Sequence, residues 1–299
     1  MSGAVHSWPG EKPVSISILR RRRMLGSLGA WASSTCWLFA VTALVLFVSD
    51  ESRAQERVSD KEIYHLAVDY CRGPLPRPMA LSAGQMLICF DGWIDDGMDL
   101  SSVRGLKDHG LFVVRSLGGH AETTITLSNL LRDRHATVVV YDYCMAACAD
   151  FLFVASDQSY VLADALVAWR DPLAGLADCT SLKTPRDDGP KRVESVPCPD
   201  ATSAELHKYE AAVSAVDGFY SERVADPKFE RPPISFDIRR SVVQLYRETG
   251  VYPKVTWTLS PRYNGAFRTN IFYEAYPKSQ EEVDAIAARL HLGRVIYDP

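Results

Sequence analysis

The sequence predicts an α/β fold with a mainly parallel sheet and a C-terminal α+β extension. Between residues 85 and 167, short apolar segments alternate with segments of helical periodicity, which is typical of a parallel sheet covered by helices. Leu111–Ser116 and Thr137–Tyr141 are apolar almost throughout rather than at every second residue, as expected for strands buried on both faces. The composition, 47% hydrophobic and 23% charged residues, is that of an ordinary globular protein.

The elements of the first half follow from local patterns. Apolar residues spaced three or four apart predict the first helix, and the proline-rich segment Gly73–Met79 ends it. Asp95 and Asp96 suit the N-terminus of a helix. In chain order, we expect helix Ser59–Cys71, strand Gln85–Asp91, helix Asp95–His109, strand Leu111–Ser116, helix Ala121–Arg134, strand Thr137–Tyr141, helix Ala146–Ala155, and a strand or strand pair over Tyr160–Val167.

The second half mixes helices with strands rich in aromatic and β-branched residues. It belongs to the same folded unit or forms a small α+β appendage. We expect helix Ser203–Val224, a break over Asp226–Pro233, helix Ser235–Thr249, strands Lys254–Leu259 and Arg268–Tyr276, helix Ser279–Leu290 and a last strand over Val295–Tyr297.

The N-terminus is typical of an export segment. Four arginines, Arg20 to Arg23, precede the uncharged run Met24–Val48, and Ser52-Arg53-Ala54 offers small residues for cleavage. Residues 1–54 are therefore a signal peptide or, because the uncharged run is long enough to cross a bilayer, a membrane anchor. Membrane contact is expected only through residues 24–48, if they are not removed. Either alternative places the rest of the chain in the periplasm or on the extracytoplasmic face of the inner membrane.

The cysteines agree with export. Cys36 lies in the apolar segment, and six cysteines remain. An even number in an exported chain predicts disulfides. We favour the pairs Cys71–Cys89, Cys144–Cys148 and Cys179–Cys198, the last of which closes a long polar loop over 171–200.

No pair of cysteines has the spacing of a zinc finger, so no metal is expected. The net charge of −4 implies no nucleic-acid partner.

Four short motifs occur in order within residues 86–170: Leu87-Ile88-Cys89-Phe90-Asp91-Gly92-Trp93-Ile94, Ser116-Leu117-Gly118-Gly119, Cys144-Met145-Ala146-Ala147-Cys148 and Val167-Ala168-Trp169. Together they resemble the pattern of the Clp-protease/crotonase superfamily, and the nearest likeness is to exported Clp-like proteins of bacteria. The resemblance implies a repeated ββα-type core. It sets the expected boundaries: an N-terminal helix and linker over 55–80, a Clp/crotonase-like domain over 81–225, and the extension over 226–299.

The resemblance also places the family's catalytic residues, and both are substituted. The nucleophilic serine falls on Ala146, the general-base histidine on Trp169, and the oxyanion turn on Gly118 and Gly119. A methyl group cannot attack a carbonyl, and an indole N–H only donates hydrogen bonds. The glycine turn can still direct backbone N–H groups at an oxygen atom, as crotonase-type enzymes do without a serine.

Two functions are therefore expected from the sequence. One is a catalytically inactive Clp-like binding or scaffold module, with no cofactor, an unknown protein or peptide partner, and a possible homo-oligomeric state. The other is a hydrolase or crotonase-like acyl enzyme with a relocated catalytic residue. The fallback candidates are a thiol at Cys144 with His120, although a disulfide-bonded Cys144 and a surface His120 are the simpler interpretation. Trp169 either packs in the core or stacks on a ligand, and Ser116 is an alternative hydroxyl or a cap of the turn.

Overall fold

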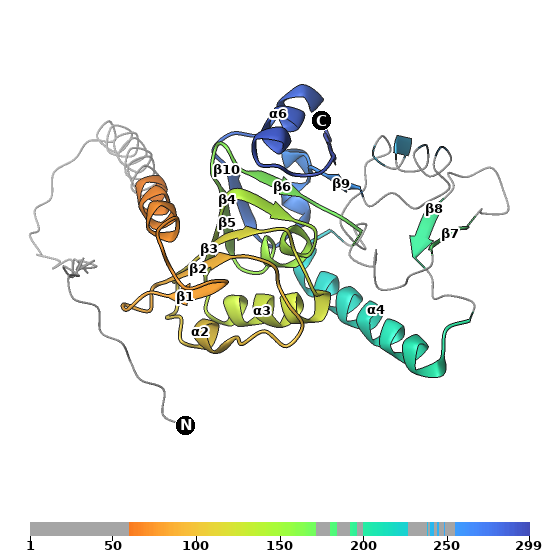
Figure 1. Cartoon of the computed structure of the whole chain (residues 1–299), viewed down its shortest axis with the longest axis horizontal. Coiled ribbons are helices and arrows are strands. Elements are labelled where there is room, and N and C mark those ends of the chain that lie inside the picture. Colours follow the sequence, from red (N-terminus) through yellow and green to blue (C-terminus); the bar gives the residue numbers. More distant parts are fainter. Residues whose placement is uncertain are drawn as a thin grey trace, which may run out of the picture. The chain divides into compact units, whose positions relative to one another are not determined.

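A mostly parallel sheet of seven strands organises the part of the chain that the computed structural model describes, which comprises residues 60–171, 180–183, 192–195, 200–226, 238, 240, 241, 244, 248 and 255–299. The strand order is β1 (Met79–Leu81), β2 (Leu87–Asp91), β3 (Leu111–Ser116), β4 (Thr137–Met145), β5 (Gln158–Val161) and β10 (Asn270–Tyr273), with β6 (Leu166–Ala168) pairing with the far end of β4. Only β1 runs antiparallel, against β2 (Figure 1). The protein is therefore an α/β protein.

Helices separate most of these strands. The helical segments are residues 60–71, α2 (Ser101–Arg104), α3 (Ala121–Asp133), the π-helix η1 (Cys148–Leu152), α4 (Ser203–Arg223), the 3-10 helix η2 (Pro261–Ala266) and α6 (Gln280–Arg289). Two small sheets accompany the large one: β9 (Thr256–Trp257) with β11 (Val295–Ile296), and β7 (Thr180–Lys183) with β8 (Arg192–Ser195). In Figure 1, α2 and α3 lie next to each other along one side of the sheet.

The core forms where the sequence is most apolar. The central residues of β2, β3 and β4 are buried, as expected for strands with few polar side chains. Helix α3 buries one stripe, whose largest side chains are Leu127 and Leu131. The predicted strand Leu111–Ser116 and the predicted α3 are confirmed, the latter ending one residue early at Asp133.

Three predictions for the first half differ from the structure. The predicted helix Asp95–His109 is helical only over α2, since Gly97 and His109 have left-handed φ values of 70° and 60° that interrupt a right-handed helix. The predicted helix Ala146–Ala155 begins later and is a π-helix, because Ala146 is also left-handed, with φ 48°. Strand β1 arises directly after the proline-rich segment, where no strand was expected.

In the second half, the predicted helices Ser203–Val224 and Ser279–Leu290 are confirmed within two residues at each end. Predicted strand Arg268–Tyr276 shortens to β10, which pairs in parallel with β5 and so places C-terminal residues in the main sheet. Lys254–Leu259 retains two strand residues. In the segment 235–249, the described residues 238, 240, 241, 244 and 248 are helical.

Several predictions fall outside the described residues. These are the export segment 1–54 with its apolar run 24–48, Cys179 and Cys198, and most of the loop 171–200, of which β7, β8 and the two end residues are described. Among the helices that are described, none combines the length and the apolar character needed to cross a bilayer.

Candidate functional site

The candidate site begins at the glycine turn that follows β3. Gly118 and Gly119 have φ values of 97° and 153°. A Cβ atom on Gly118 would lie 2.7 Å from the carbonyl oxygen of Met145, and one on Gly119 would lie 2.1 Å from that of Ile94. Both positions therefore require glycine, because the turn is pressed against the end of β4 on one side and against residue 94 on the other.

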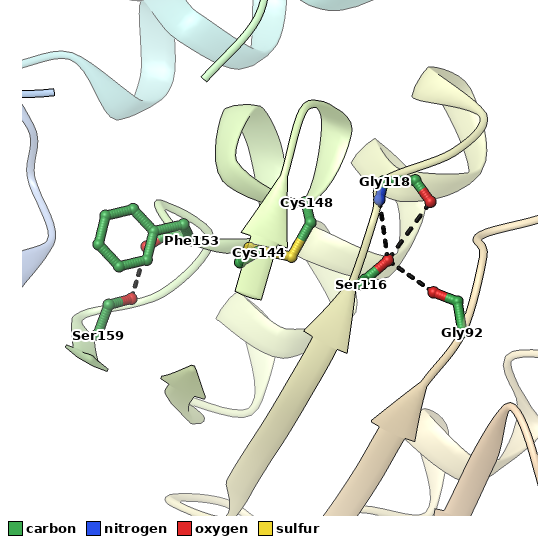
Figure 2. The surroundings of a disulfide bond; sticks show 7 residues. All are labelled: Gly92, Ser116, Gly118, Cys144, Cys148, Phe153 and Ser159. Atoms are coloured by element: carbon green, nitrogen blue, oxygen red, sulfur yellow. Dashed lines mark hydrogen bonds between the residues drawn. A yellow bond between two sulfur atoms is a disulfide. The ribbon is translucent and has the colours of Figure 1, made fainter. Parts of the chain in front are cut away.

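Ser116 shapes this turn with its side chain. Its buried hydroxyl donates to the carbonyl oxygen of Gly92 at 2.7 Å and accepts the N–H of Gly118 at 3.0 Å (Figure 2). The Ser116 hydroxyl is thus a cap of the turn and not a free nucleophile, and the Gly118 amide is already bonded. No residue in the described part of the chain accepts a hydrogen bond from the Gly119 amide.

Ala146 lies directly against the glycine turn. A Cβ atom on Gly118 would be 3.2 Å from the Ala146 Cβ atom. The Ala146 N–H donates to the carbonyl oxygen of Ala168 at 2.8 Å, and its own carbonyl accepts the N–H of Asp150 at 2.7 Å. The structure therefore brings together the turn and the alanine that the sequence analysis assigned to an oxyanion site and a nucleophile position. The side chain that Ala146 places against the turn is a methyl group.

Two disulfides confirm two of the predicted pairs, Cys71–Cys89 and Cys144–Cys148. Figure 2 shows the second bond linking β4 to η1 close to Ser116 and Gly118. The fallback proposal of Cys144 as a free thiol nucleophile is wrong for this structure, because its sulfur is bonded to Cys148 and both residues are fully buried.

His120 directly follows the glycine turn and occupies the N-cap position of α3, where its side chain makes no capping hydrogen bond. Its Nδ1 atom lies 3.8 Å from Asp96 Oδ1, which is beyond hydrogen-bond distance, and the side chain is partly exposed. In the described residues Nδ1 has no hydrogen-bond partner. With Cys144 in a disulfide, no Cys–His pair forms.

Trp169 packs in the core. Its ring stacks on Phe267 at 5.4 Å between centroids and meets Phe153 edge-on at 6.1 Å. Its backbone exchanges two hydrogen bonds with Trp257, an isolated bridge at the end of β6. The side chain is fully buried, so Trp169 is a packing residue and not an exposed platform for a ligand.

Asp150 is a buried acid that the sequence analysis did not single out. It lies in η1, and its Oδ1 accepts the backbone N–H of Arg170 at 3.3 Å. Burial raises the pKa of Asp150 well above its ordinary value, and the N–H of Arg170 offsets this only in part. The signal in the sequence was its position as the one charged residue between Tyr143 and Ser156.

The fold and this geometry define an α/β protein in which a glycine turn after one parallel strand abuts a left-handed alanine after the next. Among the described residues, no three His, Cys, Asp or Glu side chains are grouped as metal ligands would be. No protein-family model matches the chain, and no curated protein is significantly similar to it.

Proposed function

We propose that the chain is an exported Clp-like protein that lacks serine peptidase activity and acts as a binding or scaffold module in the cell envelope. The resemblance in four motifs supports the assignment to the Clp-like family. The substitutions at the nucleophile and base positions support the loss of peptidase activity. A protein or peptide partner fits such a role, and so does self-association.

One observation carries this proposal: the Ala146 methyl group lies where a Cβ atom on Gly118 would come within 3.2 Å of it, at the position that the resemblance gives to the nucleophile. The left-handed backbone at Ala146 turns the chain sharply between β4 and η1, but the residue there offers no hydroxyl or thiol. Trp169, at the position of the base, is enclosed by Phe153 and Phe267 and has no basic atom.

The two disulfides are compatible with an extracytoplasmic location, since such bonds persist in oxidising compartments. Together with the arginine-flanked apolar run at the N-terminus, they support the periplasm or the outer face of the inner membrane as the site of action.

The alternative is a hydrolase or crotonase-like acyl enzyme with a relocated catalytic residue. Two features of the structure fit this alternative. The Gly119 amide has no acceptor in the described residues, and burial raises the pKa of Asp150, four residues after Ala146, well above its ordinary value. A backbone N–H directed at an oxygen atom and an acid with a raised pKa are components of acyl-transfer sites.

Turnover of p-nitrophenyl butyrate and of a fluorogenic peptide by the purified chain separates the two functions. The proposal predicts rates equal to the buffer background for wild type and for Asp150→Asn. Turnover that Asp150→Asn abolishes, and that Asp298→Asn leaves intact, would establish the alternative. Asp298 is the matched control because it is another fully buried carboxyl group, outside the candidate site.

A further inference from the structure

We propose that the surface formed by Trp93 and Leu117, together with the carboxylates of Asp95, Asp96 and Asp99, binds a cationic polypeptide segment that also carries apolar side chains. This inference rests on the proposed binding function and names the chemistry of the partner.

Trp93 and Leu117 are presented by two backbone segments that run side by side beyond the ends of β2 and β3. The Gly92 N–H donates to the Arg115 carbonyl at 3.2 Å, and the Ile94 N–H donates to the Gly118 carbonyl at 3.0 Å. Asp91 and Arg115 are paired between β2 and β3, and Trp93 and Leu117 each lie two residues further along their segment. The two residues therefore belong to neighbouring segments. These hydrogen bonds fix the backbone before any partner arrives, which lowers the entropic cost of binding.

Both apolar side chains face solvent. Trp93 is 55% exposed and Leu117 is 48% exposed, although each is next to a glycine turn whose other residues are largely covered. Trp93 forms no ring contact with any residue in the described ranges. Neighbouring exposed apolar residues beside a rigid turn are typical of an interaction site, whereas isolated ones are common on any surface.

The rim of this surface is acidic. Asp95, Asp96 and Asp99 are exposed in the loop that follows Trp93, and Glu122 is exposed in the first turn of α3. Hydrogen bonds from the backbone and side chain of Ser101 lower the pKa of Asp99, which keeps it ionised. Two basic groups act on this rim: Arg104 also lowers the pKa of Asp99, and His120 Nδ1 lies 3.8 Å from Asp96 Oδ1. Arg115 is engaged by Asp91 and Asp142.

This combination selects the class of partner. Carboxylates attract lysine and arginine side chains, and the face of an exposed indole binds the same cations. Leu117 and the indole edge accept apolar side chains between the charges. Anionic lipid headgroups and nucleic acid would be repelled. A second copy bound through the same face would bring the carboxylates of both copies together, which disfavours self-association here.

A fluorescein-labelled hexapeptide of alternating lysine and leucine is a suitable probe, added to the full-length chain in nanodiscs of zwitterionic lipid. We expect fluorescence anisotropy to show binding about tenfold tighter than for the glutamate–leucine or lysine–serine hexapeptides, because both kinds of contact contribute. Trp93→Ala should weaken binding about tenfold. Asp95→Asn with Asp96→Asn should weaken it and reduce its dependence on salt.

Matched controls are available on other surfaces. Leu206→Ala removes an exposed apolar side chain from α4, and Asp108→Asn with Asp133→Asn removes two exposed carboxylates, before β3 and at the end of α3. Neither variant should change the affinity. Equal binding of the lysine and glutamate peptides, or no effect of Trp93→Ala, would overturn the proposal. So would light scattering that shows Trp93→Ala converting a dimer to a monomer. None of these outcomes affects the turnover assay, so the two proposals fail separately.

Discussion

Cys144 and Cys148 are joined by a disulfide on either side of Ala146, with their Cα atoms 5.3 Å apart. The bond ties Cys144, near the end of β4, to Cys148, the first residue of η1. The same covalent link therefore fixes the turn that faces Gly118 and removes the thiol nearest to it from chemistry. The candidate site is thus covalently tied at the position where the resemblance places a nucleophile.

The two disulfides should differ in their contribution to stability. The Cys71–Cys89 bond closes a loop with a sequence separation of 18, against 4 for Cys144–Cys148. From loop entropy, replacing the first pair by alanine should lower the free energy of unfolding by about 3 kcal/mol and the second by about 2 kcal/mol. Urea unfolding of the two double variants measures this difference. A larger loss from the shorter loop would show that packing around Ala146 outweighs loop entropy.

Gly119→Ala should destabilise the protein strongly. The new methyl group would meet the Ile94 carbonyl oxygen at 2.1 Å, so the backbone has to shift on one side of the turn. We expect a loss of about 2 kcal/mol or more in the free energy of unfolding, the scale of local backbone strain. Gly84→Ala is the control, since a Cβ atom there meets nothing within 4 Å. Equal stability of the two variants would contradict the close approach at Ile94.

Asp150→Asn should stabilise the protein at neutral pH. Burial raises the pKa of Asp150 in the folded state above its unfolded value, so its stabilising contribution is complete in acid and is lost as the pH rises through the folded pKa. An amide keeps the acceptor for the Arg170 N–H without the cost of ionisation. Urea unfolding from pH 4 to pH 8 should show wild type falling behind the variant as pH increases. A constant difference across this range would contradict a raised pKa of Asp150 in the folded state.

Glu274 should produce the opposite dependence on pH. Burial acts to raise its pKa, but hydrogen bonds from Tyr160 and His65 and the N–H of Ala163 outweigh it, so the pKa of Glu274 lies below its ordinary value. Its contribution to stability is therefore present above the unfolded pKa and is lost as the pH falls through the lower folded value.

We expect Glu274→Gln to reduce the acid-induced loss of stability and to loosen the helix over residues 60–71, which carries His65. Hydrogen exchange of that helix at neutral pH measures the loosening, and Gln244→Ala, a change on the described part of 235–249, serves as control. His65 Nε2 lies 2.7 Å from Glu274 Oε1. Unchanged exchange in Glu274→Gln would show that the contact between His65 and Glu274 does not hold this helix.

Patterns within short stretches of sequence predicted several elements of the fold. The strand Leu111–Ser116 followed from its apolar run, and the two described disulfides followed from proximity in sequence. The predicted helix Asp95–His109 was wrong because its composition is compatible with a helix, whereas Gly97 and His109 adopt left-handed backbone conformations that interrupt one.

At the candidate site, the resemblance assigned Gly118 to an oxyanion turn and Ala146 to a nucleophile position, but the sequence did not predict what surrounds them. The burial of Asp150 depends on packing of η1 against α4, whose Tyr220 hydroxyl donates to the Asp150 carbonyl oxygen 70 residues away in sequence. Contacts of this kind leave no local pattern. The exposure of Trp93 and Leu117 was equally hidden, because both belong to segments that otherwise read as buried strand ends.

Covalent labelling tests the central claim most directly. The intact mass of the purified chain would be measured after treatment with a fluorophosphonate and, separately, with iodoacetamide without reductant, beside a known serine hydrolase as positive control. We predict no fluorophosphonate adduct and no alkylation of Cys144, because Ala146 offers no nucleophile and Cys144 is bonded to Cys148. A stoichiometric adduct on a serine, or an alkylation lost in Cys144→Ala, would contradict the assignment of an inactive site.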